Sequence, residues 1–449
     1  MASASAMSNP AIRSRRMEEA WAAYDGDAPR PLRVGRDGSS DNVRVNLSRW
    51  MVDAYSSWIF GRDVPLTSDG TDRTTDVEAL VDMVWPMDKR MTQLLRARLE
   101  GAVTGSAFLR VLPDRVIVLP SDAVSVTVDP FDADHVLAYQ IDHMVAGDDG
   151  KSITYRQVHQ RQADEATGAR FWLITDMVST RLGKFDVVEQ TIWPFEECQI
   201  VSTQNMTAPF VWGTPDLTPD LLELVASIER AITNAAKINR IHASPMAWTR
   251  GLDPDGQRAY DRRDPASVIH LADAEQMIGH DEFGGAGADS TLALFDKLVA
   301  EFHKLTGLPN EEADAARMNG VSGAALELRL TGMIQRINAY RRTYGHLMEE
   351  VAERIQLFNG LEPVEMRPVW PSVLPEDAME AIARAKELQA LGASQETVLK
   401  TAGLDPVAEA ARIEVERPAD IGALLDRINA AAPAAAPVAM EAAAETQVA

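Results

Sequence analysis

The stretch TPDLLELVASIERAITNAAKINR, residues 218–240, predicts a helix with a well-defined beginning. Thr218 suits the N-cap position and Pro219 the first helical position. Asp220 and Glu223 lie where negative charge suits the positive end of the helix dipole. The apolar residues recur every three or four positions, at Leu221, Val225, Ile228, Ile232 and Ala235. This spacing is typical of a helix with one buried face.

This helix is followed by a turn segment and then by a second amphipathic helix. Residues 243–288 contain short strand-like runs and the turn formers DPDG and GGAG. A second helix is predicted over 290–306 and is ended by Gly307. Its apolar positions are Leu292, Phe295, Leu298, Val299 and Phe302. Two medium helices around a turn segment can stand side by side as a stalk with the turn segment at its tip.

A polar loop and a long helix follow the second stalk helix. The loop LPNEEADAARMNGVS covers 308–322, and the helix is expected over about 323–358, ending at the Asn359-Gly360 pair. Such a helix would be about 54 Å long. It carries Arg341-Arg342 and Glu349-Glu350, so we expect it to be hard to bury in one domain and to fit between neighbouring subunits.

The part of the chain before the stalk changes from helical to strand periodicity. Helices are predicted over 44–60, 76–85 and 87–103, and residues 107–200 contain alternating, β-rich runs separated by turns. We interpret these runs as an antiparallel sheet. The apolar stripe of the first helix is Leu47, Trp50, Met51, Ala54, Tyr55 and Trp58.

The end of the chain is expected to hold short helices after Pro371 and an Ala-rich tail from Asn429 onward. The tail has interspersed prolines and no apolar pattern, which predicts either disorder or an appended extension.

Composition excludes several classes of protein. Hydrophobic residues make up 46% and charged residues 25% of the 449 positions, which is typical of a folded protein. No secretory leader and no membrane span is expected. Cys198 is the single cysteine, so no disulfide forms within one chain and a reducing cytoplasm fits. The net charge of −23 disfavours a protein that wraps nucleic acid, but suits one past which DNA must slide.

The search for chemistry predicts no catalytic residue, no metal ligand and no cofactor. The chain has no phosphate-binding GxxxxGK[ST], no GxSxG and no HExxH. His346 with Glu349 and Glu350 lacks a second histidine, so a solvated helix face is favoured. The acidic DPFDADH run at 129–135 could bind a hard cation, but a solvated turn is favoured because an EF-hand's glycine and final glutamate are absent.

Two other patterns receive the same structural interpretation. The GGAG run at 284–287 is not followed by a suitably spaced Lys, Ser or Thr, so a hinge is favoured over a nucleotide loop. The tryptophans at 193, 212, 248 and 370 lie beside prolines or glycines rather than basic residues. Packing is therefore favoured over stacking on single-stranded nucleic acid.

The order of these elements resembles the portal proteins of tailed double-stranded DNA bacteriophages over about residues 46–418. Four segments carry the resemblance. They are the VNLSRWMVDAYSSWIFGRDVPL stretch, the helix–turn–helix arrangement of 219–306, the loop at 308–322 followed by a long helix that starts SGAAL, and the C-terminal LPEDAMEAIARAKELQALGASQETVLKTAGLDPVAEAARIEVER. The turn segment is short for this family.

The resemblance implies an α+β portal fold with a mixed α/β wing, a two-helix stem, a small β-containing clip, a long wing helix after a tunnel loop, and a helical crown. The corresponding ranges are 1–216 for the wing, 217–241 and 289–307 for the stem helices, 242–288 for the clip, 308–322 for the tunnel loop, 323–374 for the long wing helix, 375–428 for the crown and 429–449 for the flexible tail.

It also implies a function: a dodecameric ring at one capsid vertex, assembled in the host cytoplasm, through which DNA is packaged and ejected. The expected partners are further copies of the chain, the major capsid protein and scaffold, the terminase large subunit, a head-tail adaptor, and double-stranded DNA passing without sequence specificity. No catalytic activity and no membrane contact are expected.

The residues expected to face the channel are those of the tunnel loop, namely Asn310, Glu311, Glu312, Asp314, Arg317 and Asn319. An ordinary solvated loop is the alternative. The residues expected to meet terminase and the adaptor are those of the clip.

The clip residues are Trp248, Arg250, Asp253, Asp255, Arg258, Arg262 and Arg263. An exposed turn is their alternative. At the level of the whole chain, the alternatives are a minor capsid or head-tail adaptor protein, and an acidic α+β enzyme whose site is assembled from distant residues.

Overall fold

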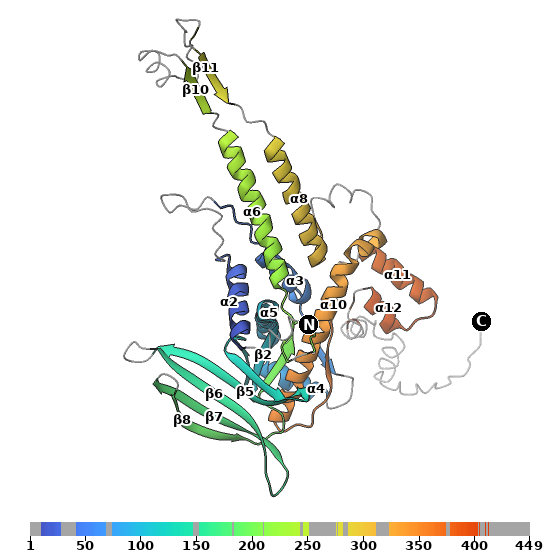
Figure 1. Cartoon of the computed structure of the whole chain (residues 1–449). Helices are drawn as coiled ribbons and strands as arrows, with labels where there is room; N and C mark the ends of the chain where they lie inside the picture. Colours follow the sequence, from blue (N-terminus) through green and yellow to red (C-terminus); the bar gives the residue numbers. More distant parts are fainter. Residues whose placement is uncertain are drawn as a thin grey trace, which may run out of the picture. The chain divides into compact units, whose positions relative to one another are not determined.

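The computed structural model describes residues 10–27, 42–68, 74–146, 152–181, 184–209, 211–242, 246–250, 275, 277–281, 286–310, 323–373, 378–402, 404, 409 and 412. The chain is a mixed α+β protein that divides into two compact units, Met1–Val373 and Leu374–Ala449 (Figure 1). The larger unit contains all of the described strands and most of the described helices.

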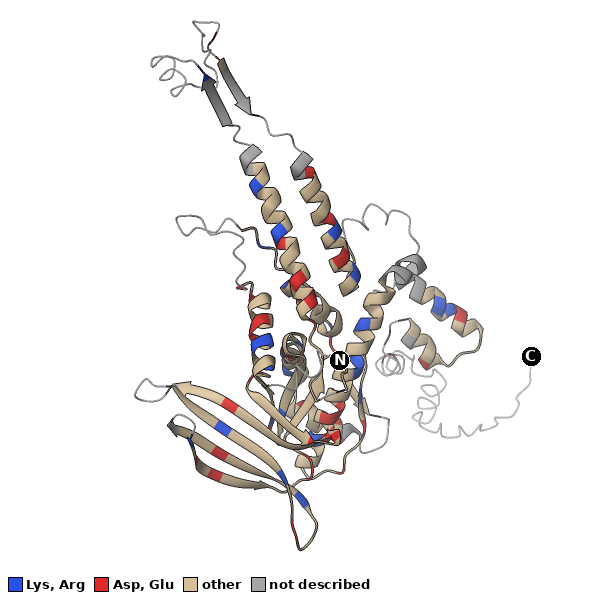
Figure 2. Ribbon diagram, in the orientation of Figure 1, with Lys and Arg blue, Asp and Glu red and all other residues tan. Residues whose placement is uncertain are grey.

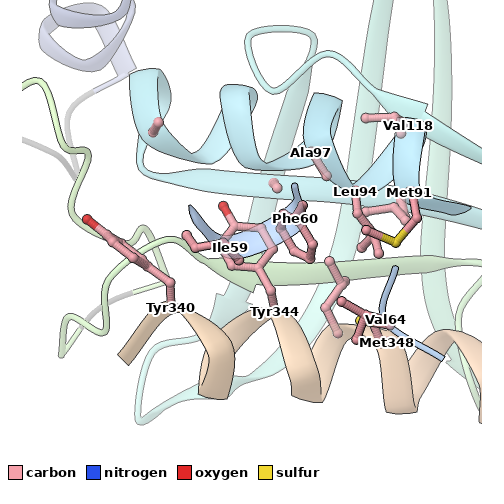
Figure 3. Packing of buried hydrophobic residues seen from close by; sticks show 14 of the residues in the cluster. Ile59, Phe60, Val64, Met91, Leu94, Ala97, Val118, Tyr340, Tyr344 and Met348 are labelled. Atoms are coloured by element: carbon pink, nitrogen blue, oxygen red, sulfur yellow. The ribbon is translucent and has the colours of Figure 1, made fainter. Parts of the chain in front are cut away.

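The core of the larger unit is built by helices. They are α2 (Pro10–Asp25), α3 (Leu47–Phe60), α4 (Thr74–Val84), α5 (Met87–Thr104) and α10 (Gly323–Phe358). Tyr344 and Met348 of α10 pack with Phe60 of α3 and Leu94 of α5 in one apolar cluster (Figure 3). Burial of this cluster supplies the main stabilising term of the unit.

Two small sheets border this core. β2 (Ser106–Leu112) pairs antiparallel with both β3 (Arg115–Leu119) and β9 (Ile200–Gln204), and β1 (Leu66–Ser68) pairs with β12 (Met366–Pro368). The pair β1–β12 joins segments that are distant in the sequence.

A five-stranded antiparallel sheet extends from this body, in the order β4-β5-β6-β7-β8. Its strands are β4 (Val124–Asp129), β5 (Asp132–Ala146), β6 (Ser152–Ala163), β7 (Arg170–Arg181) and β8 (Lys184–Trp193). Tyr139 and Trp172 lie in a second apolar cluster with Phe108 of β2. The antiparallel sheet predicted for 107–200 is therefore confirmed, as two sheets rather than one.

The predicted helix, turn segment and helix are present. α6 (Pro219–His242) and α8 (Ala286–Thr306) run side by side, and β10 (Met246–Arg250) pairs antiparallel with β11 (Met277–Asp281) beyond their far ends (Figure 1). α8 begins four residues before the predicted start at Ser290, so the GGAG run partly enters the helix. We call α6, α8, β10 and β11 the stalk.

The long helix α10 has the predicted bounds, and Gly360 after it is left-handed with φ of +76°. The expectation that it would be hard to bury in one domain is wrong. From Met333 to Phe358 its apolar residues recur on one face, which is buried in the core of the larger unit. Its charged residues are accommodated at the edge of that core, where Arg354 donates to the carbonyls of Cys198 and Ile200.

Two expectations about the first part of the chain need correction. Helix α2 was not predicted, although Met17, Ala20 and Tyr24 form a buried stripe at helical spacing. In α3, Trp50 and Trp58 were assigned to the apolar stripe but are 42% and 36% exposed. The buried face is instead centred on Met51, Val52, Tyr55 and Ile59.

The smaller unit holds α11 (Ala378–Ala390) and α12 (Gln395–Thr401), two of the short helices predicted after Pro371. The tail at 429–449 lies outside the described residues. None of the helices described in either unit is long and apolar enough to cross a membrane.

Candidate functional site

The two helices of the stalk leave several apolar side chains of α8 exposed. At about 1.5 Å per residue, α6 is about 36 Å and α8 about 32 Å long. α6 buries Leu221, Val225 and Ile228 towards the body, whereas α8 buries only Phe302 and Thr306 at its base among its described side chains. Leu294 and Leu305 of α8 are 52% and 58% exposed, and Leu292 is also exposed. Figure 2 shows acidic and basic residues interspersed along both helices, with uncharged residues between them.

The base of the stalk rests on a buried polar network centred on Asp216, three residues before α6. The carboxylate accepts hydrogen bonds from Tyr340 Oη at 2.6 Å and Asn205 Nδ2 at 2.9 Å, and from the Arg98 guanidinium. Arg98 and Asp216 are both buried, so each neutralises a charge that would otherwise be costly in this environment.

Arg98 of α5 is fixed from several sides. Its second terminal nitrogen donates to Asn205 Oδ1 at 2.6 Å, and its guanidinium lies 4.2 Å from the ring centroid of Tyr340. Burial lowers the pKa of Arg98, but Asp216, Tyr344 and Tyr340 together raise it by more and hold the pKa above its ordinary value. Arg98 is therefore a permanent cation under the stalk.

The two tyrosines of α10 stay neutral at this junction. Burial raises the pKa of Tyr340 above its ordinary value, and Asp216 raises it further. Burial also raises the pKa of Tyr344, whose hydroxyl donates to Asn205 Oδ1 at 3.2 Å. Gly101 of α5 makes this approach possible, because a Cβ there would lie 2.2 Å from the Tyr344 hydroxyl.

The end of α8 is bound to the same network. Tyr55 Oη of α3 donates to the Thr306 carbonyl, and Arg336 of α10 donates to that carbonyl at 3.2 Å. Arg336 also donates to Tyr340 Oη at 3.0 Å. A cation at the last carbonyls of α8 suits both its unpaired acceptors and its dipole.

This arrangement fixes both stalk helices to one rigid base. Asp216 precedes α6, Thr306 ends α8, and the side chains that bind them come from α3, α5 and α10. The junction holds the two helices in register. It leaves its tyrosines protonated, and the described part of the chain has no group of three His, Cys, Asp or Glu residues placed to hold a metal ion.

The residues predicted for the channel and the clip are described only in part. Asn310 is half-buried, four residues after the end of α8. Trp248 and Arg250 both belong to β10, and Arg250 is exposed. The structure thus places three of the thirteen residues and brings two of them together. The others lie outside the described residues, namely Glu311, Glu312, Asp314, Arg317, Asn319, Asp253, Asp255, Arg258, Arg262 and Arg263.

Sequence reasoning did not find the junction under the stalk. Arg98 and Asp216 are 118 residues apart, and nothing in the local pattern of either marks it as half of a buried pair. The one available signal is on α10, where Arg336, Tyr340 and Tyr344 recur at a spacing of four and place polar atoms on the buried face.

The other candidate motifs behave as ordinary structure. His346 contacts Glu350 at 3.0 Å and Glu349 at 3.8 Å on the side of α10 and is mostly exposed. In the DPFDADH run, the carboxylates of Asp129 and Asp132 accept hydrogen bonds from nearby backbone amides. Cys198 is buried, and burial raises the pKa of its thiol to about 12.

Comparison with known proteins gives similarities in structure but none in sequence. No protein-family model matches the chain, and no curated protein sequence matches it. The fold is similar to that of a chain in the neck of an empty GTA (gene transfer agent) particle, computed with C6 symmetry. The TM-score is 0.45 and the identity 13%, over 84% of this chain and 95% of that chain.

Proposed function

We propose that this chain is a portal protein of a tailed bacteriophage or phage-like particle, one subunit of a ring through which double-stranded DNA enters and leaves the head. The observation that carries the proposal is the stalk. Two long helices stand on one rigid base, with an antiparallel strand pair at their far end.

The surface of the stalk supports assembly. An isolated two-helix stalk leaves a flank of α8 in water, including Leu294 and Leu305. In a ring of identical subunits the same flank would lie against the next stalk, which removes that apolar area from water. Because the base holds α6 and α8 in one register, every copy presents the same flank to its neighbour.

The loop at 308–322 would then face the bore. Its first end follows the anchored Thr306, and its second end leads into α10, which carries Arg336. We propose that Asn310, Glu311, Glu312, Asp314, Arg317 and Asn319 line the narrowest part of the channel.

The charge supports a passive channel. With −23 per chain, twelve copies carry about −276, which repels a polyanion if much of it faces the bore. We propose that the protein has no catalytic activity and that a separate ATPase drives packaging, because phosphate gripping would need the opposite sign of charge.

The far end of the stalk, with Trp248 and Arg250 on β10, is proposed to dock the terminase large subunit during packaging and the head-tail adaptor afterwards. The unit that carries the five-stranded sheet is proposed to contact the major capsid protein and scaffold, at the portal vertex of the virion.

Particle mass and electron microscopy test the proposal. The purified protein is expected to form rings of about twelve copies with a central hole, consistent with closed cyclic symmetry. A monomer or dimer at every concentration tested would remove the portal assignment. An adaptor or an enzyme would then be the better description.

A further inference from the structure

The five-stranded sheet meets the rest of the larger unit along a seam that has an apolar and a polar part. In the apolar part, Phe108 of β2 lies in one buried cluster with Tyr139 of β5 and Trp172 of β7. In the polar part, Arg110 of β2 donates from Nη1 to Gln157 Oε1 of β6 at 2.9 Å. Phe108 and Arg110 are two residues apart, so they lie on the same face of their strand. We call these contacts between β2 and the sheet the seam.

The hydrogen bonds of the seam determine which nitrogen of His159 carries its hydrogen. Gln157 Nε2 donates to Asp176 Oδ1 of β7 at 2.7 Å, so the amide oxygen of Gln157 is the atom that faces Arg110 and His159. This oxygen lies 2.9 Å from His159 Nε2. An amide oxygen can only accept, so Nε2 carries the hydrogen. In the neutral ring, Nδ1 is therefore the nitrogen left to take up a proton.

A proton at Nδ1 would be poorly accommodated in the closed seam. His159 is fully buried, and its Nδ1 has no hydrogen-bond partner among the described residues. A second proton would create a buried cation without an acceptor, close to the guanidinium of Arg110. Burial, and then Arg110, lower the pKa of His159 to about 3. The closed seam thus favours the neutral ring.

The other groups that face His159 do not offset this charge. Directly opposite it on the neighbouring strands are Tyr139 of β5 and Ile174 of β7. Burial raises the pKa of Tyr139 to about 12, so this residue is neutral in acid. Arg161 follows two positions along β6 and is already paired with Glu196 at 3.1 Å.

We propose that His159 is a latch: when Nδ1 takes up a proton, the seam opens and the five-stranded sheet detaches from β2 while the helical core stays folded. The strands β5 to β8 pair with one another over long registers, so they can move as one body. The buried residues of the seam form a cluster separate from the one that holds the helices together. Local openings of this kind need less free energy than global unfolding. The inference concerns one chain and rests on neither the ring nor the portal assignment.

Cys198 provides a direct measure of the opening. It is the single cysteine, it is 4% exposed, and it lies in the apolar cluster of the seam. The measurement is its rate of reaction with a dithiodipyridine reagent, divided by the rate of glutathione at the same pH. In the open seam His159 has its ordinary pKa near 6.5, so this ratio should rise about 25-fold from pH 7 to pH 5.

Two matched variants test the assignment to His159. His159→Gln cannot take up the proton, so its relative rate should be nearly the same at both pH values. His143→Gln changes an exposed histidine of β5 and should keep the wild-type rise. A wild-type rate that does not depend on pH, or a full rise that persists in His159→Gln, would overturn the latch.

Hydrogen exchange followed by mass spectrometry separates local opening from unfolding of the whole unit. After correction for the intrinsic exchange rates, peptides from β5, β6 and β7 should lose protection from pH 7 to pH 5, whereas α5 and α10 should not. An equal loss in α10 would overturn the latch, because the core would then open together with the sheet. This comparison uses the wild-type chain, so it decides the question even if His159→Gln does not fold. Particle mass does not enter either readout, so the portal assignment is tested separately.

Discussion

At the scale of single residues, a change of one atom at Asp216 should strongly lower the free energy of unfolding. It accepts from Arg98, Asn205 and Tyr340 in the buried base of the stalk. Asp216→Asn keeps the shape but leaves the Arg98 cation buried without its counter-charge. Breaking a buried pair in this way costs about 3–5 kcal/mol. Urea unfolding followed by tryptophan fluorescence should show this loss in the free energy of unfolding.

The matched control is Asp114→Asn, which removes the partner of Arg115 in a pair that is more than half exposed on both sides. Exposed pairs contribute about 0–1 kcal/mol, so this variant should unfold close to the wild type. Equal losses in the two variants would mean that the junction under the stalk has no special role.

His159 of β6 gives the fold a predictable sensitivity to acid. It is fully buried, and burial, assisted by Arg110, lowers its pKa to about 3. In the unfolded chain this histidine has an ordinary pKa near 6.5. Below that pH the unfolded chain therefore binds a proton that the folded chain does not bind. The contribution of the uncharged His159 to the free energy of unfolding is therefore fully present above about pH 6.5 and is lost as the pH falls towards 3. The loss should reach about 3 kcal/mol at pH 4.

The free energy of unfolding of wild type and His159→Gln, measured between pH 7 and pH 4, checks this prediction. The variant should be less stable at pH 7 but should lose less stability on acidification. His143→Gln, an exposed position on the neighbouring strand, should keep the wild-type pH dependence. A wild-type slope in His159→Gln would show that other groups cause the acid sensitivity.

At the scale of elements, the sequence predicts structure well where one helix buries one continuous stripe. α6 and α10 follow such stripes: α6 begins at the predicted Pro219 and ends at His242, two residues past the predicted end, and α10 has the predicted bounds before Asn359-Gly360. Helix α2 was missed because its buried face mixes Arg13 with small residues, and it is stabilised by distant groups such as Trp212 and the Ser121 carbonyl. Trp50 was misplaced because periodicity does not show how wide the buried face is.

The loop after α8 is the element whose charge can be tested directly. Replacing Glu311 and Glu312 with lysine raises the charge of each chain by four units next to the proposed path of DNA. Attraction to phosphate would then replace repulsion. Packaging should slow while rings of normal mass still form. The measurement is the rate at which DNA becomes protected from nuclease inside particles that carry the variant.

The control for this double variant is Glu165→Lys with Glu189→Lys, which makes the same charge change at exposed positions beside β6 and on β8. It should package at the wild-type rate. If the two double variants package equally fast, the loop does not line the channel.

At the scale of the whole molecule, composition and element order predicted the α+β class and the stalk, but not the junction under the stalk. The pair of Arg98 and Asp216 joins segments that are distant in the sequence. No local pattern marks such a meeting. The net charge, in contrast, is known from the sequence alone. It directly affects the proposed assembly, because like-charged copies repel one another.

Assembly of this chain should be promoted by salt. Copies that each carry −23 repel one another, and the Debye length falls from about 30 Å at 0.01 M to about 8 Å at 0.15 M salt. The proposed contact between copies along the flank of α8 is mostly apolar, so screening weakens the repulsion more than the attraction. The concentration for half-assembly, measured by sedimentation velocity, should therefore fall as salt rises over this range. A ring held mainly by ion pairs between copies would respond in the opposite direction, and that result would overturn the apolar interface on which the ring model depends.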